Sequence, residues 1–160
     1  MIRVAVITIS DSAVAGTRAD ASGPALRERA ASLGWHVVAH ELLPDEQPQI
    51  AAALARIADS GQASVLLTTG GTGVALRDVT PEATRAVIER EVPGLAELMR
   101  AEGLKHTPKA VLSRGIAGLR GRTLIVNLPG SPKGAVESLD AIAHLIPHVV
   151  DLLEGRTNHT

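Results

Sequence analysis

The 160-residue chain contains no cysteine, no phenylalanine and no tyrosine, and Trp35 is its only aromatic residue. The absence of cysteine excludes disulfides, thiolate catalysis and cysteine-ligated metal sites. Proteins that bind single-stranded nucleic acid stack the bases on aromatic side chains, which this chain lacks. A formal net charge of −1 gives no general attraction to polyanions. We therefore expect no nucleic-acid partner.

Long apolar runs are also missing, because no stretch approaches the roughly 20 residues that a membrane-spanning helix needs. The first residues, Met1 to Val6, resemble a strand and not a charged leader with a cleavage site. The sequence therefore predicts a cytoplasmic protein without a membrane partner. Since no linker or repeat interrupts the chain, we expect one domain over residues 1–156 and a frayed tail over 157–160.

Aliphatic sequence is abundant, and it alternates between the two common periodicities. Runs rich in Val, Ile and Leu predict strands at 4–9, 36–43 and 64–69, and two short strands within 112–127, the second at 123–126. Apolar stripes at helical spacing predict helices at 22–33, 45–57, 81–90, 93–103, 132–146 and 147–155. This β-α-β rhythm predicts an α/β fold in which helices cover both faces of a mostly parallel sheet. We expect Trp35, which lies between a helix and a strand, to be structural.

Two predicted strands end in glycine-bearing loops, TTGGTG at 68–73 and NLPGSPKG at 127–134. Ligands of open parallel sheets bind beyond the carboxyl ends of the strands. Glycine lets the backbone approach a ligand, and exposed amides and hydroxyls hold phosphate oxygens. Both loops are therefore candidate anion sites. Neither matches a named nucleotide fingerprint, and each is also what a tight strand-to-helix turn requires.

The second loop has further features of an anion site. Ser131 suits the N-cap position and Pro132 the first helical turn, and Lys133 is close to the same helix start, where an anion is favoured. The segment from Gly103 to Lys133 contains six basic residues and no carboxylate. Such a segment in a nearly neutral chain fits either a pocket for an anionic molecule or an ordinary solvated surface.

Two aspartates follow predicted strands and are candidates for catalysis and for Mg²⁺ binding. Asp45 comes directly after the strand at 36–43, and Asp78 follows the first glycine loop by five residues. Carboxylates beside phosphate-binding loops are placed to hold Mg²⁺, which also bridges nucleotide phosphates. The alternative is that each aspartate caps the helix that follows it. The six histidines include no H-E-x-x-H motif, and we predict no zinc site.

Taken together, these segments resemble the Mog/MoaB family of molybdenum-cofactor biosynthesis, which includes the plant and animal molybdopterin adenylyltransferase domains. The resemblance extends from Val4 to about Glu154 and rests on motifs that occur in the family's order. They are ISD at 9–11, PDE at 44–46, TGGTG at 69–73, RDVTPEA at 77–83, PG at 93–94, LSR at 112–114 and NLPG at 127–130.

The resemblance implies a three-layer α/β/α sandwich with a mixed sheet, a homotrimer and contact with the enzyme that inserts molybdenum. It implies transfer of AMP from Mg-ATP to the phosphate of molybdopterin, with release of pyrophosphate. By position, Asp45 and Asp78 match the family's catalytic and Mg²⁺-binding aspartates. The implied substrate-binding residues are Ser10, Asp11, Thr69, Gly70, Gly71, Thr72, Gly73, Ser113, Asn127, Pro129, Gly130, Ser131 and Lys133.

Three alternatives remain open at the level of sequence. A non-catalytic member of the family binds molybdopterin or assists assembly without transferring AMP. The related domain of nicotinamide-nucleotide amidohydrolases is a more distant enzymatic possibility. A purely structural, oligomer-forming domain predicts that neither ATP nor pterin raises the melting temperature.

Overall fold

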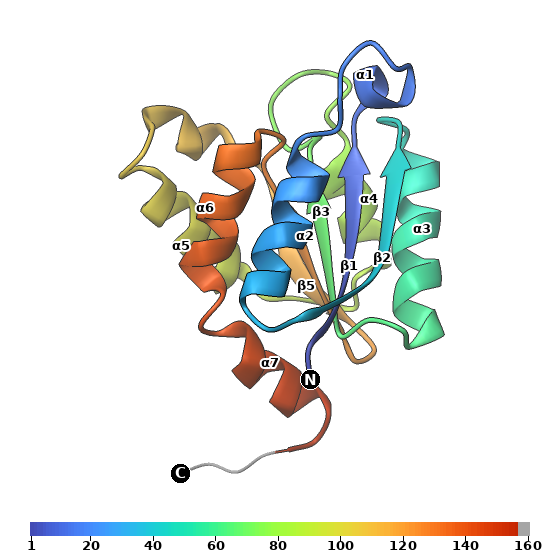
Figure 1. Cartoon of the computed structure of the whole chain (residues 1–160), viewed down its shortest axis with the longest axis vertical. Helices are drawn as coiled ribbons and strands as arrows, with labels where there is room; N and C mark the ends of the chain where they lie inside the picture. The colour runs from blue at the N-terminus through green and yellow to red at the C-terminus, as the bar shows by residue number, and fades with distance from the viewer. Residues whose placement is uncertain (157–160) are drawn as a thin grey trace.

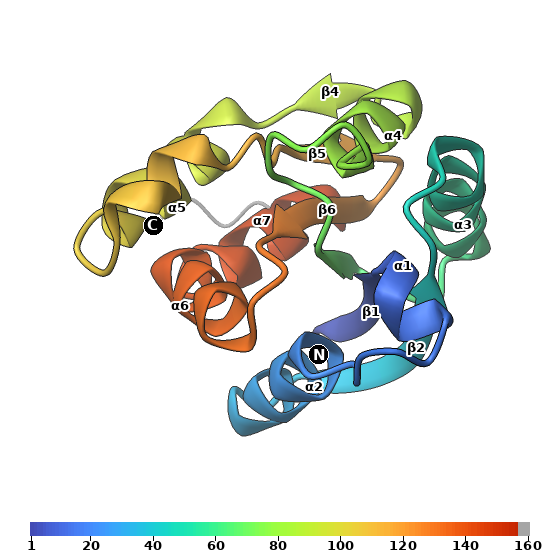
Figure 2. The same cartoon turned by 90° about the horizontal axis from the view of Figure 1, so that it is seen from above.

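Six strands form a single sheet in the order β2-β1-β3-β6-β5-β4 in the computed structural model, which describes residues 1–156 (Figures 1 and 2). The predicted frayed tail at 157–160 lies outside the described residues. The strands are β1 (Arg3–Ile9), β2 (His36–Leu43), β3 (Val65–Thr69), β4 (Arg90–Glu91), β5 (Ala117–Arg120) and β6 (Thr123–Leu128). β2, β1, β3 and β6 run parallel, and β5 and β4 continue the sheet antiparallel. The mostly parallel, mixed sheet expected from the sequence is confirmed.

Helices cover both faces of this sheet, as Figure 2 shows from above. They are α1 (Asp11–Val14), α2 (Ser22–Ser32), α3 (Gln47–Ser60), α4 (Thr80–Val87), α5 (Pro93–Gly103), the 3₁₀ helix η1 (Pro108–Leu112), α6 (Pro132–Ile142) and α7 (Ile146–Leu153). α2, α5, α6 and α7 pack on one face, and α3 and α4 pack on the other. The three-layer α/β/α arrangement is therefore confirmed.

The buried strands alternate between two aliphatic cores. On β1, Val4 and Val6 face the core under α2 and α6, whereas Ala5 and Ile7 face the core under α3 and α4. Successive side chains of a strand point to opposite faces, so a strand covered on both faces is apolar at every position. Trp35 is buried in the first of these cores, which confirms its predicted structural role.

The structure corrects several predicted boundaries. α4 ends at Val87 and not at Arg90, because Arg90 and Glu91 pair with Leu119 and Gly118 as the edge strand β4. The predicted helix at 132–146 ends at Ile142, and a turn separates it from α7. α1, β4 and η1 were not predicted, because elements of two to five residues are too short to show a periodicity. Along residues 1–156, no helix combines the length and apolarity needed to cross a membrane.

Candidate active site

The four parallel strands all end at the same edge of the sheet, where Figure 1 shows the heads of β1, β2 and β3. Most of the predicted site residues lie at or after these strand ends. β1 leads into Ser10 and Asp11, and β2 leads into Asp45. β3 leads into the glycine loop at 70–73, and β6 into the loop at 129–131. Parallel connectivity thus brings together residues more than a hundred positions apart.

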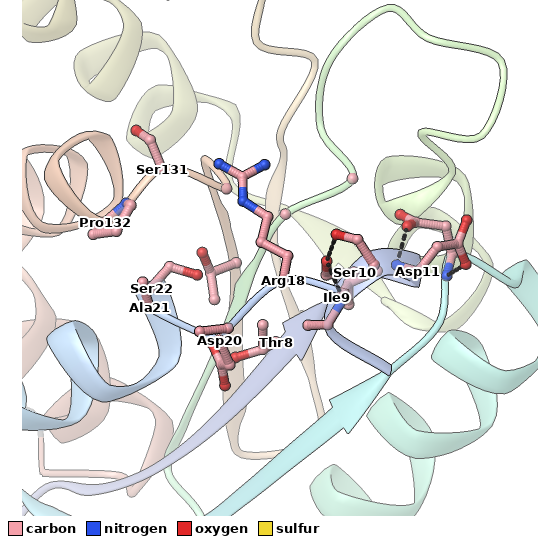
Figure 3. Close-up of a pocket in the computed structure, with 18 of the residues that line it drawn as sticks. Thr8, Ile9, Ser10, Asp11, Arg18, Asp20, Ala21, Ser22, Ser131 and Pro132 are labelled. Atoms are coloured by element: carbon pink, nitrogen blue, oxygen red, sulfur yellow. Dashed lines mark hydrogen bonds between the residues drawn. The ribbon is translucent and has the colours of Figure 1, made fainter. Parts of the chain in front are cut away.

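Two cavities open at this edge. The first cavity, of about 440 Å³, lies between the β1 exit, the α1–α2 loop and the two glycine-bearing loops, and Figure 3 shows it. Asp11, Asp20, Asp45 and Asp78 line it together with Arg18. The second cavity, of about 550 Å³, lies between the loop at 71–74, the η1 segment and the start of α6. Val74, Leu112 and Pro129 contribute to its apolar lining. Both volumes are typical of small-molecule sites.

The cavities share a wall made of Gly71, Asp78, Gly130 and Ser131. Two of these four residues are glycines and have no side chain, so ligands bound in the two cavities could approach each other closely at this wall. Adjoining cavities of this size can hold two molecules side by side, which is the proximity that a reaction between them needs.

Glycine is required where the first loop passes β1. Gly70 has φ +104°, and a Cβ there would overlap the Ile9 carbonyl oxygen. Gly71 has φ +68°, and a Cβ there would overlap Thr80 Oγ1 and come within 3.0 Å of Asp45 Oδ1. Both positions therefore combine a backbone conformation that favours glycine with a space that admits no side chain.

Hydrogen bonds fix the two loops to each other. Thr69 Oγ1 donates to the Pro129 carbonyl over 2.6 Å, and the Gly70 amide donates to the Leu128 carbonyl over 3.1 Å. Within the described part of the chain, the amides of Gly71, Thr72 and Gly73 donate no hydrogen bond. Three free amides on a fixed loop are suitable donors for phosphate oxygens.

Asp45 and Asp11 hold each other through their backbones. The Asp11 amide donates to Asp45 Oδ2, and the Asp45 amide donates to Asp11 Oδ1, each over 3.0 Å. Arg77 donates to both oxygens of Asp11 and thereby lowers the pKa of that carboxyl. Burial raises the pKa of Asp45, and the negative charges of Asp11 and Asp78 raise it further. The hydrogen bond from the Asp11 amide and the positive charge of Arg77 lower it in part. Asp45 is therefore a half-buried carboxyl whose ionised form gains from an added cation.

Neither aspartate caps a helix. Glu46 and Val79 occupy the N-cap positions of α3 and α4, and neither cap has a side-chain hydrogen bond. Asp78 Oδ2 instead accepts from the Ala75 amide over 3.0 Å within its own loop. The capping alternative is wrong for both residues, and both carboxylates line the first cavity.

A sequence profile described as a probable molybdopterin binding domain matches residues 5–148. The chain belongs to this family. The molybdopterin adenylyltransferase of Helicobacter pylori J99 is 43% identical over 159 residues, which cover 96% of this chain and 89% of that protein. The molybdopterin adenylyltransferase of Escherichia coli K12 is 39% identical over 168 residues, covering 96% and 86%. The molybdopterin biosynthesis enzyme MoaB of Thermus thermophilus has 55% identity and a TM-score of 0.91, covering 97% of this chain and 98% of that one.

In this member of the family, Asn127 lies beneath the loops and its polar atoms are engaged. Its side-chain amide nitrogen donates to Thr68 Oγ1 and Thr84 Oγ1, and its side-chain oxygen Oδ1 accepts from the Ile116 backbone amide. Asn127 touches only a recess of about 50 Å³ that continues the second cavity. Thr72 and Ser113 line the second cavity itself, and Ser10 lines the first.

The structure confirms the predictions that Ser131 is the N-cap of α6 and that Pro132 lies in its first turn. Ser131 is the N-cap, and its Oγ accepts from the Gly134 amide over 3.0 Å. Lys133 lines neither cavity, because its side chain is 88% exposed and its Nζ lies 3.8 Å from Glu137. The prediction that Lys133 reaches an anion bound at this loop stays a prediction.

Two arginines of the basic segment at 103–133 stabilise the fold. Arg114 donates to the backbone carbonyls of Gly73 and Asp78 and forms an ion pair with Glu82 at 2.8 Å. It therefore stabilises the conformation of the first glycine loop. Arg120 pairs with Asp59 at the opposite end of the sheet. Lys109 is the member of the segment that lines the second cavity without a carboxylate within 4 Å among residues 1–156.

Arg18 is a cation of the first cavity that was not predicted from the sequence. It lies in the α1–α2 loop, and Figure 3 shows its guanidinium extending toward Ser131. In the described structure it forms neither an ion pair nor a side-chain hydrogen bond. No motif or charge cluster surrounds Arg18 in the sequence, so only the folded loop reveals its position.

Proposed function

We propose that this chain is a molybdopterin adenylyltransferase that transfers AMP from Mg-ATP to the phosphate of molybdopterin. The observation that carries the proposal is the pair of cavities that meet at Gly71, Asp78, Gly130 and Ser131, in a chain 43% identical to a protein of that activity. One cavity for each substrate would bring the two reacting phosphates to a common wall.

We assign the nucleotide to the first cavity and the pterin to the second. The first cavity has the carboxylates Asp45 and Asp78 and the free guanidinium of Arg18, which suit Mg-ATP. The second has an apolar lining that includes Val74 and Leu112, which suits a fused ring system in a protein without Phe or Tyr. Aliphatic side chains replace aromatic stacking there.

The residues present fit a magnesium ion. Mg²⁺ is usually held by one or two carboxylates together with substrate phosphates and water, and Asp45 and Asp78 offer such a pair. Among residues 1–156 no three His, Cys, Asp or Glu side chains form a complete metal site, so substrate phosphates would supply the remaining ligands. When bound, the ion would neutralise charge on the phosphates.

The chemical step needs positioning and charge compensation more than a protein nucleophile. A phosphate oxygen of molybdopterin forms a bond to the α-phosphorus of ATP, and the bond to the β-phosphate bridge breaks, releasing pyrophosphate. The amides of Gly71, Thr72 and Gly73 would hold the phosphates that approach the shared wall. Thr69 and Arg114 would keep these amides in place through their bonds to the loops.

The test is to incubate the purified protein with ATP, Mg²⁺ and molybdopterin and to measure pyrophosphate and adenylyl-molybdopterin. Asp78→Asn should retain the fold and pterin binding but lose turnover by roughly 100- to 1,000-fold, since it removes one of the two carboxylates proposed to hold Mg²⁺. Pterin binding without pyrophosphate release by the wild type would identify a non-catalytic member of the family. Near wild-type turnover of Asp78→Asn would remove Asp78 from the mechanism.

The family resemblance supports three further proposals. The protein would act in the cytoplasm, as a homotrimer, and would pass its product to the enzyme that inserts molybdenum. The trimer is tested by light scattering of the eluting protein, which should give three times the 16.6 kDa mass of the chain.

A further inference from the structure

Glu137 is a carboxylate inside the second cavity that the adenylyl-transfer chemistry does not use. It lies on α6 and lines the cavity together with Ser138, Thr107 and Lys109. Its side chain is only 21% exposed. A carboxylate so enclosed normally has hydrogen-bond donors.

The nearest basic groups lie too far from Glu137 to donate a hydrogen bond to it. His106 Nδ1 lies 3.6 Å from one carboxylate oxygen and Lys133 Nζ lies 3.8 Å from the other. Both distances exceed a hydrogen bond, and the Lys133 side chain is largely in solvent. Both oxygens of Glu137 are thus left without a hydrogen bond in the described structure.

We propose that Glu137 recognises the pyrimidine edge of the pterin, an inference that rests on the function proposed above. A pterin presents N3–H and a 2-amino group side by side, and a carboxylate accepts from such a fork with both oxygens, as it does from arginine. Adenine presents a ring lone pair beside its amino group, so the same carboxylate would repel it. Glu137 therefore makes the second cavity selective for the pterin over the nucleotide base.

The position of Glu137 along α6 agrees with this role. Ser131, in the shared wall, is the N-cap of α6, and Glu137 lies six residues further along, roughly 9 Å by helical rise. Three fused six-membered rings and a methylene separate the phosphate of molybdopterin from its pyrimidine edge by roughly 10 Å at ordinary bond lengths. A molecule with its phosphate at the shared wall would thus bring its pyrimidine edge to Glu137.

The test compares two fluorescent probes, 6-hydroxymethylpterin phosphate and the corresponding lumazine, in which a carbonyl oxygen replaces the 2-amino group. The wild type should bind the pterin at least 10-fold more tightly than the lumazine, because the carbonyl faces a carboxylate. Glu137→Gln should weaken pterin binding by about 10- to 100-fold, as for a lost hydrogen bond to a charged group. The same substitution should remove most of the preference over lumazine.

Glu28→Gln is the matched control, because Glu28 is an exposed glutamate on α2 that lines neither cavity. It should bind both probes as the wild type does, and thermal melting should show that both variants are folded. Glu137→Asp should recover part of the selectivity. An additional readout is the KM for ATP, which Glu137→Gln should leave unchanged.

Two results would overturn the assignment. One is a Glu137→Gln variant that retains the wild-type ratio of pterin to lumazine affinity, and the other is a wild type that does not discriminate between the probes. If either occurs while the wild type still releases pyrophosphate with molybdopterin and ATP, the recognition role fails and the adenylyltransferase stands. Absence of both pterin binding and pyrophosphate release would overturn the proposed function, and the role of Glu137 with it.

Discussion

Replacing Gly70 by alanine should damage both the stability and the site of this protein. A residue other than glycine at φ +104° costs about 1–3 kcal/mol. The new Cβ would also overlap the Ile9 carbonyl oxygen, which belongs to β1 and has no side-chain freedom to move. Forcing an atom into such a space typically costs about 1–3 kcal/mol more.

Gly121 provides the matched control for this substitution. It lies in the β5–β6 turn at the opposite end of the sheet, has φ +55°, and a Cβ there would meet no atom within 4 Å. Gly121→Ala should therefore lose only the conformational part, about 1–2 kcal/mol. The two variants should differ by about 2 kcal/mol, which corresponds to about 4–8 °C in melting temperature for a protein of this length.

Differential scanning calorimetry of the two variants measures this difference, and pyrophosphate release reports on the site. Gly70→Ala should lose most of its adenylyl transfer at a temperature where it is still folded, because the displaced loop contributes to both cavities. Gly121→Ala should retain it. Equal melting temperatures for the two variants would refute the steric argument, and full activity of Gly70→Ala would refute the placement of the site.

Two further substitutions test individual side chains. Arg18→Ala should raise the KM for ATP by about 10-fold or more, as for a lost charged hydrogen bond, and leave the KM for molybdopterin unchanged. The control Arg122→Ala should alter neither KM. An unchanged KM for ATP in Arg18→Ala would show that Arg18 does not bind the phosphates. Burial lowers the pKa of His40, the positive charge of Arg27 lowers it further, and Asp20 opposes both effects. Just below the ordinary pKa of histidine, His40 is therefore protonated less often in the folded protein than in the unfolded chain. Stability should therefore fall as the pH drops from about 7.5 to about 5.5, and the melting temperature of His40→Asn should fall less over that range; equal falls would contradict the assignment.

The sheet and its edge were predictable from the sequence because the physics that forms them is local. A strand buried on both faces must be apolar at every position, as Val65–Leu67 is, and glycine must follow where a loop passes close to a strand. The convergence of Asp45, Asp78 and the two glycine loops follows from parallel connectivity alone. That part of the site required only the order of the elements.

The roles of single side chains were less predictable, because they depend on distances across the fold. Asn127 is predicted to contact substrate, and only the fold reveals that its polar atoms bond to Thr68, Thr84 and Ile116. Lys133 points into solvent although its neighbour Ser131 caps the helix in the expected way. Arg18 and Glu137 carry no sequence signal, since an isolated charge in a loop or a helix is usually a solvated one.

The hydrogen bonds that join the two loops at Thr69–Pro129 and Gly70–Leu128 also bear on how the two ligands affect each other. Because the cavities share one bonded wall, a ligand that shifts or stiffens this wall from one side alters binding on the other. Thermodynamic linkage requires that effect to be reciprocal: the factor by which a nucleotide changes the affinity for pterin equals the factor by which pterin changes the affinity for the nucleotide. Measuring the affinity of each ligand in the presence of the other therefore gives a single coupling free energy for this wall.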